Sequence, residues 1–131
     1  MILQEKNRIY GKTKEIDTIS LKKAFADERF DFVQLALLFG SRVTGKAHSK
    51  SDYDFAILTK ENIDAPWGVK AKAYNVIEEV LGLCGECDFD VVDLKNANSV
   101  ILDSIKEAYL ILKGDENEFS RLFAKKYKNC K

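Results

Sequence analysis

The sequence predicts a mixed α/β domain in which a small β-sheet is flanked by helices. Short apolar runs of strand length alternate with amphipathic segments of helical period, and this alternation is typical of the class. The chain has 131 residues, of which 46% are hydrophobic, so it can bury a sizeable core without disulfides. We therefore expect a single domain over residues 1–131.

The first two thirds of the chain predict two helices and three strands. Residues 1–15 show no clear periodicity, and a helix is expected from about Ser20. Nearly continuous apolar runs predict buried strands over 33–39 and 53–59. After Pro66, an apolar stripe at helical spacing, formed by Tyr74, Ile77 and Leu81, predicts a long helix. A β-branched run predicts a third strand within DFDVVDL, residues 88–94.

The last third predicts a helix from Asn98, a short strand over 109–112 and a final helix over about 115–128. The final helix has acidic residues first and basic residues late, as the helix dipole favours. It also carries an apolar stripe, which predicts core packing rather than a partner surface. The stripe consists of Phe119, Leu122, Phe123 and Tyr127.

Composition narrows the range of functions. Lys and Arg together number 21 and so do Asp and Glu, so the formal net charge is zero. This balance argues against a long nucleic acid as the main ligand, although a local basic patch is still compatible with it. The three cysteines do not form a disulfide framework, and no apolar run approaches the length of a membrane span or signal segment. We expect a cytoplasmic protein without a membrane partner.

Two aspartates separated by one residue, Asp52 and Asp54, enter the second predicted strand. Strand side chains alternate between faces, so both carboxylates point the same way, about 7 Å apart along the strand. Close carboxylates repel each other unless a cation or solvent screens them, and this layout suits Mg²⁺. For an isolated D-x-D, however, a turn cap followed by an exposed strand residue is the commoner explanation.

The pair Gly40–Ser41 directly follows the first strand and strengthens the metal hypothesis. Glycine lets the backbone approach a ligand closely, and N–H groups of a following helical turn, with the serine hydroxyl, can bind phosphates. The combined pattern G-S-x10-D-x-D, with apolar strands on both sides, is much rarer than either part. A phosphate site and metal carboxylates on adjacent strands outline a nucleotide site.

The segment GSRVTGKAHSKSDYDFAIL, residues 40–58, resembles the signature of the DNA polymerase β-type nucleotidyltransferase superfamily. The short length and the segment FDVVDLKNANSVILDSIKEAYLIL make the chain similar to the minimal nucleotidyltransferases (MNT). These are the small partners of HEPN proteins in bacterial and archaeal toxin–antitoxin pairs. The resemblance covers about residues 18–113 and implies a polymerase β-like fold.

The resemblance also implies a set of site residues. Asp52 and Asp54 would bind two Mg²⁺ ions, and a third acid on a neighbouring strand would join them. Asp90 matches that third position, Asp88 is the alternative on the same face, and Asp93 is expected to cap the strand end. Two further roles concern the phosphates. Gly40 and Ser41 would grip the β- and γ-phosphates, whereas Arg42 could either contact phosphate or be a solvated loop residue.

The implied function is the transfer of NMP, AMP from ATP, to a hydroxyl group. By the resemblance, the acceptor is a tyrosine of a HEPN-type toxin and the chain is its antitoxin. Two alternatives stay open: neutralisation of the partner by binding alone, and a free nucleotidyltransferase for a small molecule such as an aminoglycoside. The sequence predicts neither the acceptor itself, nor the preferred base, nor the oligomeric state.

A few other side chains could carry chemistry but are expected to be structural. Cys84 and Cys87 form a C-x-x-C without the second ligand pair that a zinc site needs. His48 lies in a lysine-containing loop, where a surface residue is the simpler interpretation. The neighbouring Lys46 and Lys50 could attract a triphosphate, but a solvated loop explains them equally well.

Overall fold

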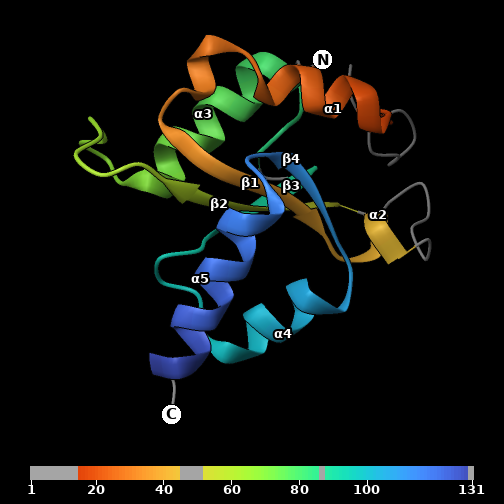
Figure 1. Cartoon of the computed structure of the whole chain (residues 1–131). Helices are drawn as coiled ribbons and strands as arrows, with labels where there is room; N and C mark the ends of the chain where they lie inside the picture. The colour runs from red at the N-terminus through yellow and green to blue at the C-terminus, as the bar shows by residue number, and fades with distance from the viewer. Residues whose placement is uncertain (1–14, 45–51, 86–87, 130–131) are drawn as a thin grey trace.

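The computed structural model describes residues 15–44, 52–85 and 88–129, with the backbone alone for 125–129. The elements lie in three layers: α1 and α3 cover one face of a β-sheet, and α4 and α5 cover the other (Figure 1). In chain order they are α1 (Thr18–Phe25), the 3-10 turn η2 (Glu28–Phe30), β1 (Val33–Phe39), α2 (Ser41–Thr44), β2 (Tyr53–Thr59), α3 (Val69–Leu81), β3 (Phe89–Asp93), α4 (Ser99–Glu107), β4 (Tyr109–Lys113) and α5 (Glu116–Asn129).

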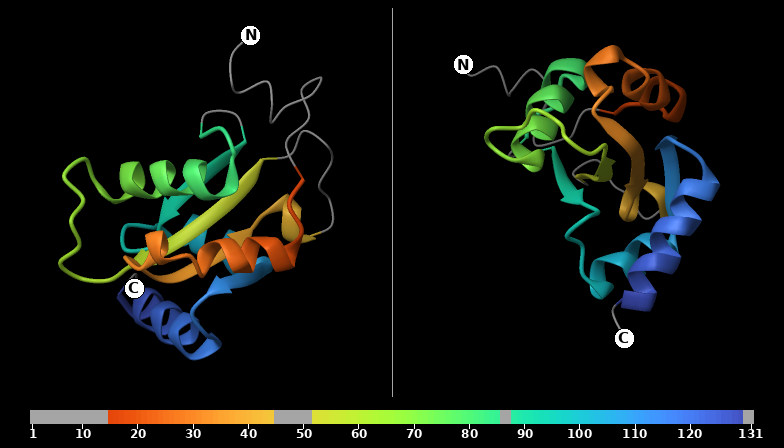
Figure 2. Two further views of the ribbon diagram at one scale, coloured as in Figure 1. Left: turned by 90° about the horizontal axis from the view of Figure 1, so that it is seen from above. Right: turned by 60° about the vertical axis from the view of Figure 1, so that its left-hand side comes forward.

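The described sheet has the strand order β3-β2-β1-β4. Strand β1 pairs antiparallel with β2 and with β4, whereas β2 and β3 are parallel. A parallel pair needs a crossover connection, and helix α3 provides it. Figure 2 shows α3 beside α1 over the same face of the sheet. This order places the ends of β1, β2 and β3 next to one another.

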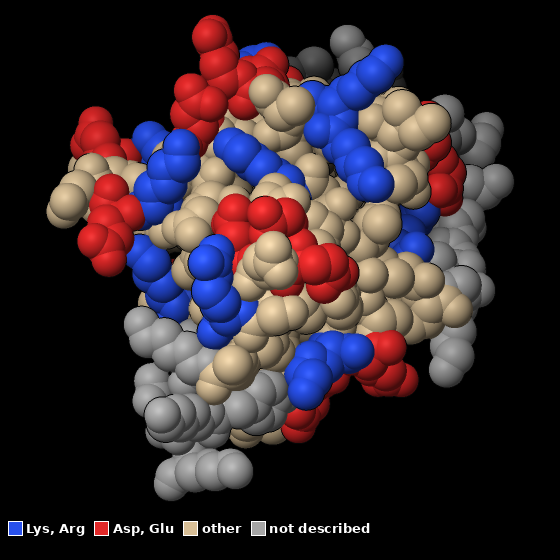
Figure 3. Space-filling view, viewed as in Figure 1, with Lys and Arg blue, Asp and Glu red and all other residues tan. Residues whose placement is uncertain are grey.

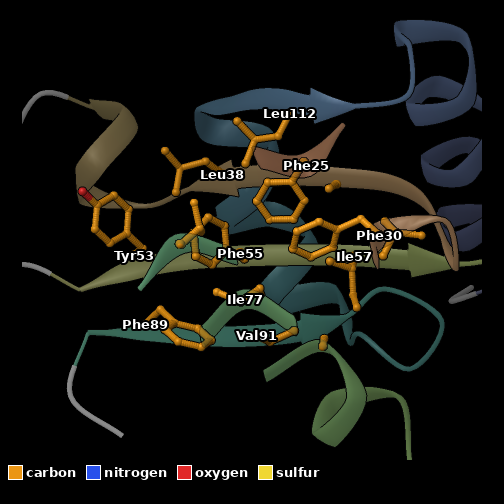
Figure 4. Packing of buried hydrophobic residues seen from close by; sticks show 14 of the residues in the cluster. Phe25, Phe30, Leu38, Tyr53, Phe55, Ile57, Ile77, Phe89, Val91 and Leu112 are labelled. Carbon is orange, nitrogen blue, oxygen red and sulfur yellow. The ribbon is translucent and has the colours of Figure 1, made fainter. Parts of the chain in front are cut away.

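Each face of the sheet has its own apolar core. The core under α1 and α3 is rich in aromatic residues, and Figure 4 shows how they pack between helix and strands. Its ring contacts include Phe25 with Phe30 at 4.4 Å between centroids and Phe55 with Phe89 at 6.0 Å. The core under α4 and α5 contains β1, β2 and β3 residues together with helix residues such as Leu102 and Phe119.

Local sequence signals explain where the helices begin and end. Asp17 caps α1 by accepting a hydrogen bond from the Ser20 N–H at 2.8 Å. Asn98 caps α4 in the same way through the Ile101 N–H at 3.0 Å. Helix α3 ends at Gly82, which adopts the left-handed conformation with φ of +69°.

The structure confirms the predicted fold class and element order. The long helix starts at Val69 because Gly68, with φ of +98°, precedes it in an extended turn. The third strand is one residue shorter at each end than DFDVVDL, and α2 is a single added turn. Phe119 and Phe123 are buried against α4 and β1, as the core reading of the stripe predicted. The side chain of Tyr127 lies outside the described residues.

Two findings bear on membranes and charge. None of the helices in the described ranges has the length and apolar character that crossing a membrane requires. Basic and acidic side chains are interspersed on the face that Figure 3 shows, without a broad region of one sign. This face offers none of the uniform positive potential that a nucleic acid backbone would need.

Candidate active site

Gly40, Asp54 and Asp90 lie in a row across three neighbouring strands. Gly40 directly follows Phe39, the last residue of β1, and Phe39 pairs with Asp54 of β2. Asp54 in turn pairs directly with Asp90 of β3. Residues paired in this way point to the same face of a sheet, so the Asp54 and Asp90 carboxylates are neighbours. The alternation of β2 places both on the face that α4 and α5 cover.

The surroundings of Asp54 disfavour the charged form of its carboxyl group. Burial raises its pKa above the ordinary value for aspartate, and the negative charges of Asp90 and Asp52 raise it further. Asp52 stands immediately before β2 and is exposed to solvent. The three acids predicted from the sequence therefore lie within electrostatic reach of one another. A cation between them would relieve the repulsion.

Gly40 makes room for the Asp54 carboxylate. Its φ is +82°, and a Cβ at this position would collide with Oδ2 of Asp54 and lie 3.3 Å from Cγ. Its carbonyl oxygen accepts hydrogen bonds from the N–H groups of Val43 and Thr44, which closes the short turn α2 that begins at Ser41. Glycine is thus required here both for the backbone conformation and for the close approach to the acid.

Tyr74 of α3 reaches the carboxylate of Asp90 from beyond the edge of the sheet. Its hydroxyl donates a hydrogen bond to Oδ1 of Asp90, and the same oxygen accepts the Val91 N–H at 2.9 Å. The ring stacks on Phe89 with 4.9 Å between centroids. Burial, together with the bond to Asp90 and its charge, raises the pKa of Tyr74 to about 12, so the hydroxyl is a donor at neutral pH.

Asp88 has a different environment from Asp90. It is fully buried, and its Oδ2 accepts the N–H of Cys84 at 2.8 Å. Its main chain also bonds to Cys84 and, through its carbonyl oxygen, to the N–H of Tyr53. Asp88 thus orders the connection between α3 and β3, whereas the exposed acid beside Asp54 is Asp90. Asp93 accepts from the N–H of Lys95 at 3.1 Å and caps the strand end, as predicted.

Arg42 contacts Glu15 and the ring of Tyr53. Its guanidinium binds Glu15 at 2.7 Å and lies 4.5 Å from the centre of the Tyr53 ring, with only 7% of the side chain exposed. Tyr53 in turn accepts a hydrogen bond from the Ile16 N–H through its hydroxyl. These contacts tie the segment before α1 to the start of β2. A phosphate contact by Arg42 stays a prediction.

The carboxylates of the row match part of the coordination shell that Mg²⁺ prefers. Across the described ranges, no three His, Cys, Asp or Glu side chains are placed to hold one metal ion in common. The neighbouring carboxylates of Asp54 and Asp90 nevertheless fit an ion that takes one or two protein oxygens and completes its shell with water and phosphate. The raised pKa of Asp54 and the space that Gly40 leaves agree with such an ion. Coordination by all three acids at once stays a prediction.

The remaining predicted candidates lie away from this row or outside the described residues. Cys84 is buried beside the α3–β3 connection. Two cysteines, Cys87 and Cys130, lie outside the described residues. The same is true of the loop residues Lys46, His48 and Lys50.

Sequence reasoning missed the role of Tyr74, which it placed only on the apolar stripe of the long helix. A tyrosine in such a stripe carries a hydroxyl that needs a partner, and this need was the available signal. The identity of that partner, 16 residues away on a strand, depends on how α3 packs against β3.

Comparisons with known proteins agree with this geometry. The family model described as "Polymerase beta, Nucleotidyltransferase" matches residues 19–117. The protein adenylyltransferase MntA of Shewanella oneidensis is 32% identical over 75 residues, which cover 56% of this chain and 48% of that protein. The match therefore spans about half of the curated relative.

Solved structures share the fold. A toxin–antitoxin structure with AMP-PNP has a TM-score of 0.64 at 23% identity, with 86% of each chain covered. The MNT antitoxin complex with tri-AMPylated HEPN toxin from Shewanella oneidensis has a TM-score of 0.57 at 21% identity, with 86% of this chain and 85% of that chain covered. At these identities the likeness concerns the fold alone.

Proposed function

Because the chain belongs to the polymerase β nucleotidyltransferase family, we propose that it transfers AMP from ATP to a tyrosine hydroxyl of a HEPN-type toxin and so acts as its antitoxin. The relatives support each part of the proposal. One is named a protein adenylyltransferase, one was crystallised with AMP-PNP, and one is the antitoxin bound to an AMPylated HEPN toxin.

The observation that carries the proposal is the row formed by Gly40, Asp54 and Asp90. A backbone turn that can face phosphates, and two carboxylates that repel each other, stand on adjacent strands. Such an arrangement costs stability in the absence of a ligand. It is therefore expected where a cation and a charged substrate bind.

Asp54 and Asp90, with Asp52 beside them, would hold Mg²⁺ at the sheet edge. Two Mg²⁺ ions bound there would supply Lewis-acid chemistry, which would lower the pKa of an acceptor hydroxyl and neutralise charge on the leaving pyrophosphate. Gly40 and Ser41 would present main-chain and hydroxyl donors to the β- and γ-phosphates. These groups would thus align the α-phosphate between the leaving pyrophosphate and the acceptor hydroxyl.

A second function is favoured by one observation. The guanidinium of Arg42, a residue that could contact phosphate, is bound to Glu15 and lies over the Tyr53 ring. An antitoxin that neutralises its partner by binding alone could keep such a site in an auxiliary form. The same experiment separates the two functions.

The test combines the chain with a HEPN-type toxin, α-labelled ATP and Mg²⁺. We expect label on the toxin with the native chain and a loss of roughly a hundredfold or more with Asp52→Ala/Asp54→Ala. Asp64→Asn serves as a matched control because Asp64 is an exposed acid outside the row. Transfer that survives the double change would overturn the metal assignment, and a double variant that still neutralises the toxin would favour binding alone.

A further inference from the structure

A groove of about 610 Å³ runs along the outer edge of β3. It lies between the start of α3 and the segment that joins β3 to α4, and its lining includes Trp67, Lys70, Asp90, Asn96 and Ile101. We propose that this groove binds the extended, tyrosine-bearing segment of the protein acceptor. The inference rests on the function proposed above and deepens it by locating the acceptor.

The strand order indicates which substrate enters here. Phosphoryl transfer needs the attacking and leaving oxygens roughly in line, on opposite sides of the phosphorus. In the order β1-β2-β3, Gly40 stands at one end of the row and Asp90 at the other. With the pyrophosphate end of ATP at Gly40, the acceptor oxygen must approach from the Asp90 side. Asp90 is also part of the groove lining, so the groove opens onto the reacting position.

The groove suits a peptide chain. Strand β3 is an edge strand of the described sheet. An extended segment can align along such an edge through main-chain hydrogen bonds. Trp67, which is 88% exposed, stands at the groove, and Ile101 adds partly buried apolar surface. Tryptophan is enriched among the residues that contribute most of the binding energy at protein interfaces.

The Asp90 carboxylate already accepts a phenolic hydroxyl in this structure, namely that of Tyr74. An acceptor tyrosine would meet the same carboxylate from the groove side. In the transfer step its phenol oxygen bonds to the α-phosphorus of ATP while the bond from that phosphorus to pyrophosphate breaks. The phenol proton passes to solvent water, and AMP ends as a phosphodiester on the tyrosine.

Trp67 provides a direct test because it is the only tryptophan of the chain. Tryptophan-free synthetic peptides that each span one tyrosine of the toxin are titrated into the full chain while tryptophan emission is recorded. We expect a saturable blue shift with one of these peptides and none with ATP alone. Silent titrations with all of the peptides would overturn the proposal. A shift with ATP would also overturn it, because the groove would then be a nucleotide site.

Kinetics of transfer to the intact toxin give the second arm. Trp67→Ala is expected to raise the KM for the toxin roughly tenfold or more, as loss of an interface anchor does, and to leave the KM for ATP unchanged. Ile19→Ala on α1 is the matched control, since Ile19 is another exposed apolar residue, 69% exposed, and is absent from the groove lining. An unchanged KM for the toxin would contradict the proposal.

The two arms separate this inference from the proposed function. If the native chain transfers no AMP to the toxin, the proposed function fails, and the emission titration still decides whether the groove binds the peptide. If transfer proceeds and Trp67→Ala behaves like Ile19→Ala, the function stands and the groove assignment fails.

Discussion

The hydroxyl of Tyr74 donates a hydrogen bond to Oδ1 of Asp90, which couples helix α3 to the acid at the edge of the candidate site. The stacking of the Tyr74 ring on Phe89 holds the hydroxyl in place. Residues that orient a metal-binding carboxylate commonly affect metal affinity or activity by ten- to a hundredfold. Tyr74 is therefore expected to act as a positioning residue.

Tyr74→Phe should raise the Mg²⁺ concentration that half-saturates AMP transfer by roughly tenfold. The phenylalanine keeps the stacking but no longer orients Asp90. Metal affinity measured directly, by calorimetry with Mn²⁺ in the absence of ATP, should weaken in parallel. Tyr109→Phe is the control, because the Tyr109 hydroxyl also donates to a carboxylate, that of Glu116, at 3.0 Å on another part of the fold. Equal effects of the two changes would argue against a positioning role.

Asp54 should destabilise the metal-free protein at neutral pH. Its folded-state pKa is raised, so its favourable contribution is complete below the ordinary aspartate pKa and is lost as the pH rises through the folded value. In Mg²⁺-free buffer, Asp54→Asn is thus expected to raise Tm at pH 7 and to have little effect at pH 3. Mg²⁺ should raise the Tm of the native chain but not that of the variant. A variant that melts below the native chain at pH 7 without metal would refute this expectation.

Gly40→Ala should abolish transfer with only a modest loss of stability. The left-handed φ costs a non-glycine residue about 1–2 kcal/mol, and the added Cβ would in addition displace the Asp54 carboxylate. Gly82→Ala isolates the first effect, because Gly82 also has a left-handed φ, +69°, but stands at the far end of α3 and outside the groove lining. Thermal melts should show similar losses for both variants, and only Gly40→Ala should lose transfer. Loss of transfer in both would mean that strain alone explains the defect.

Asp88 and Asp90 should separate into a structural and a functional acid. Asp88→Ala leaves the buried N–H of Cys84 without its acceptor, which is expected to cost about 1–3 kcal/mol of unfolding free energy. Asp90→Asn, which keeps an oxygen acceptor for the Tyr74 hydroxyl, should lower transfer strongly and leave denaturant unfolding nearly unchanged. Should Asp90→Asn retain transfer at native rates, the third acid would have to be sought elsewhere.

The strands and the shared face of the acids were predictable from the sequence. Apolar runs that end at Gly40 predict β1, and the alternation of β2 places Asp52 and Asp54 on one side without reference to the rest of the fold. The same alternation put Asp88 and Asp90 on one face. It could not separate them, because burial against Cys84 depends on the turn that follows α3.

Contacts between side chains that are far apart in the sequence were not predictable. Arg42 follows the phosphate-binding turn in sequence, yet it binds Glu15, 27 residues earlier. The strand order β3-β2-β1 is also a tertiary property, since a parallel neighbour of β2 could have stood on either edge. In this order β3 is the edge strand, and the groove lined by Asp90 and Trp67 lies along it.

The most direct measurement is intact-mass spectrometry of the HEPN-type toxin after incubation with this chain, ATP and Mg²⁺. We expect the toxin to gain the mass of one or more AMP groups on tyrosine with the native chain and with Asp64→Asn. With Asp52→Ala/Asp54→Ala the toxin should keep its original mass. An unmodified toxin with the native chain, or an AMPylated toxin with the double variant, would contradict the assignment of Asp52 and Asp54 as the acids that drive AMP transfer.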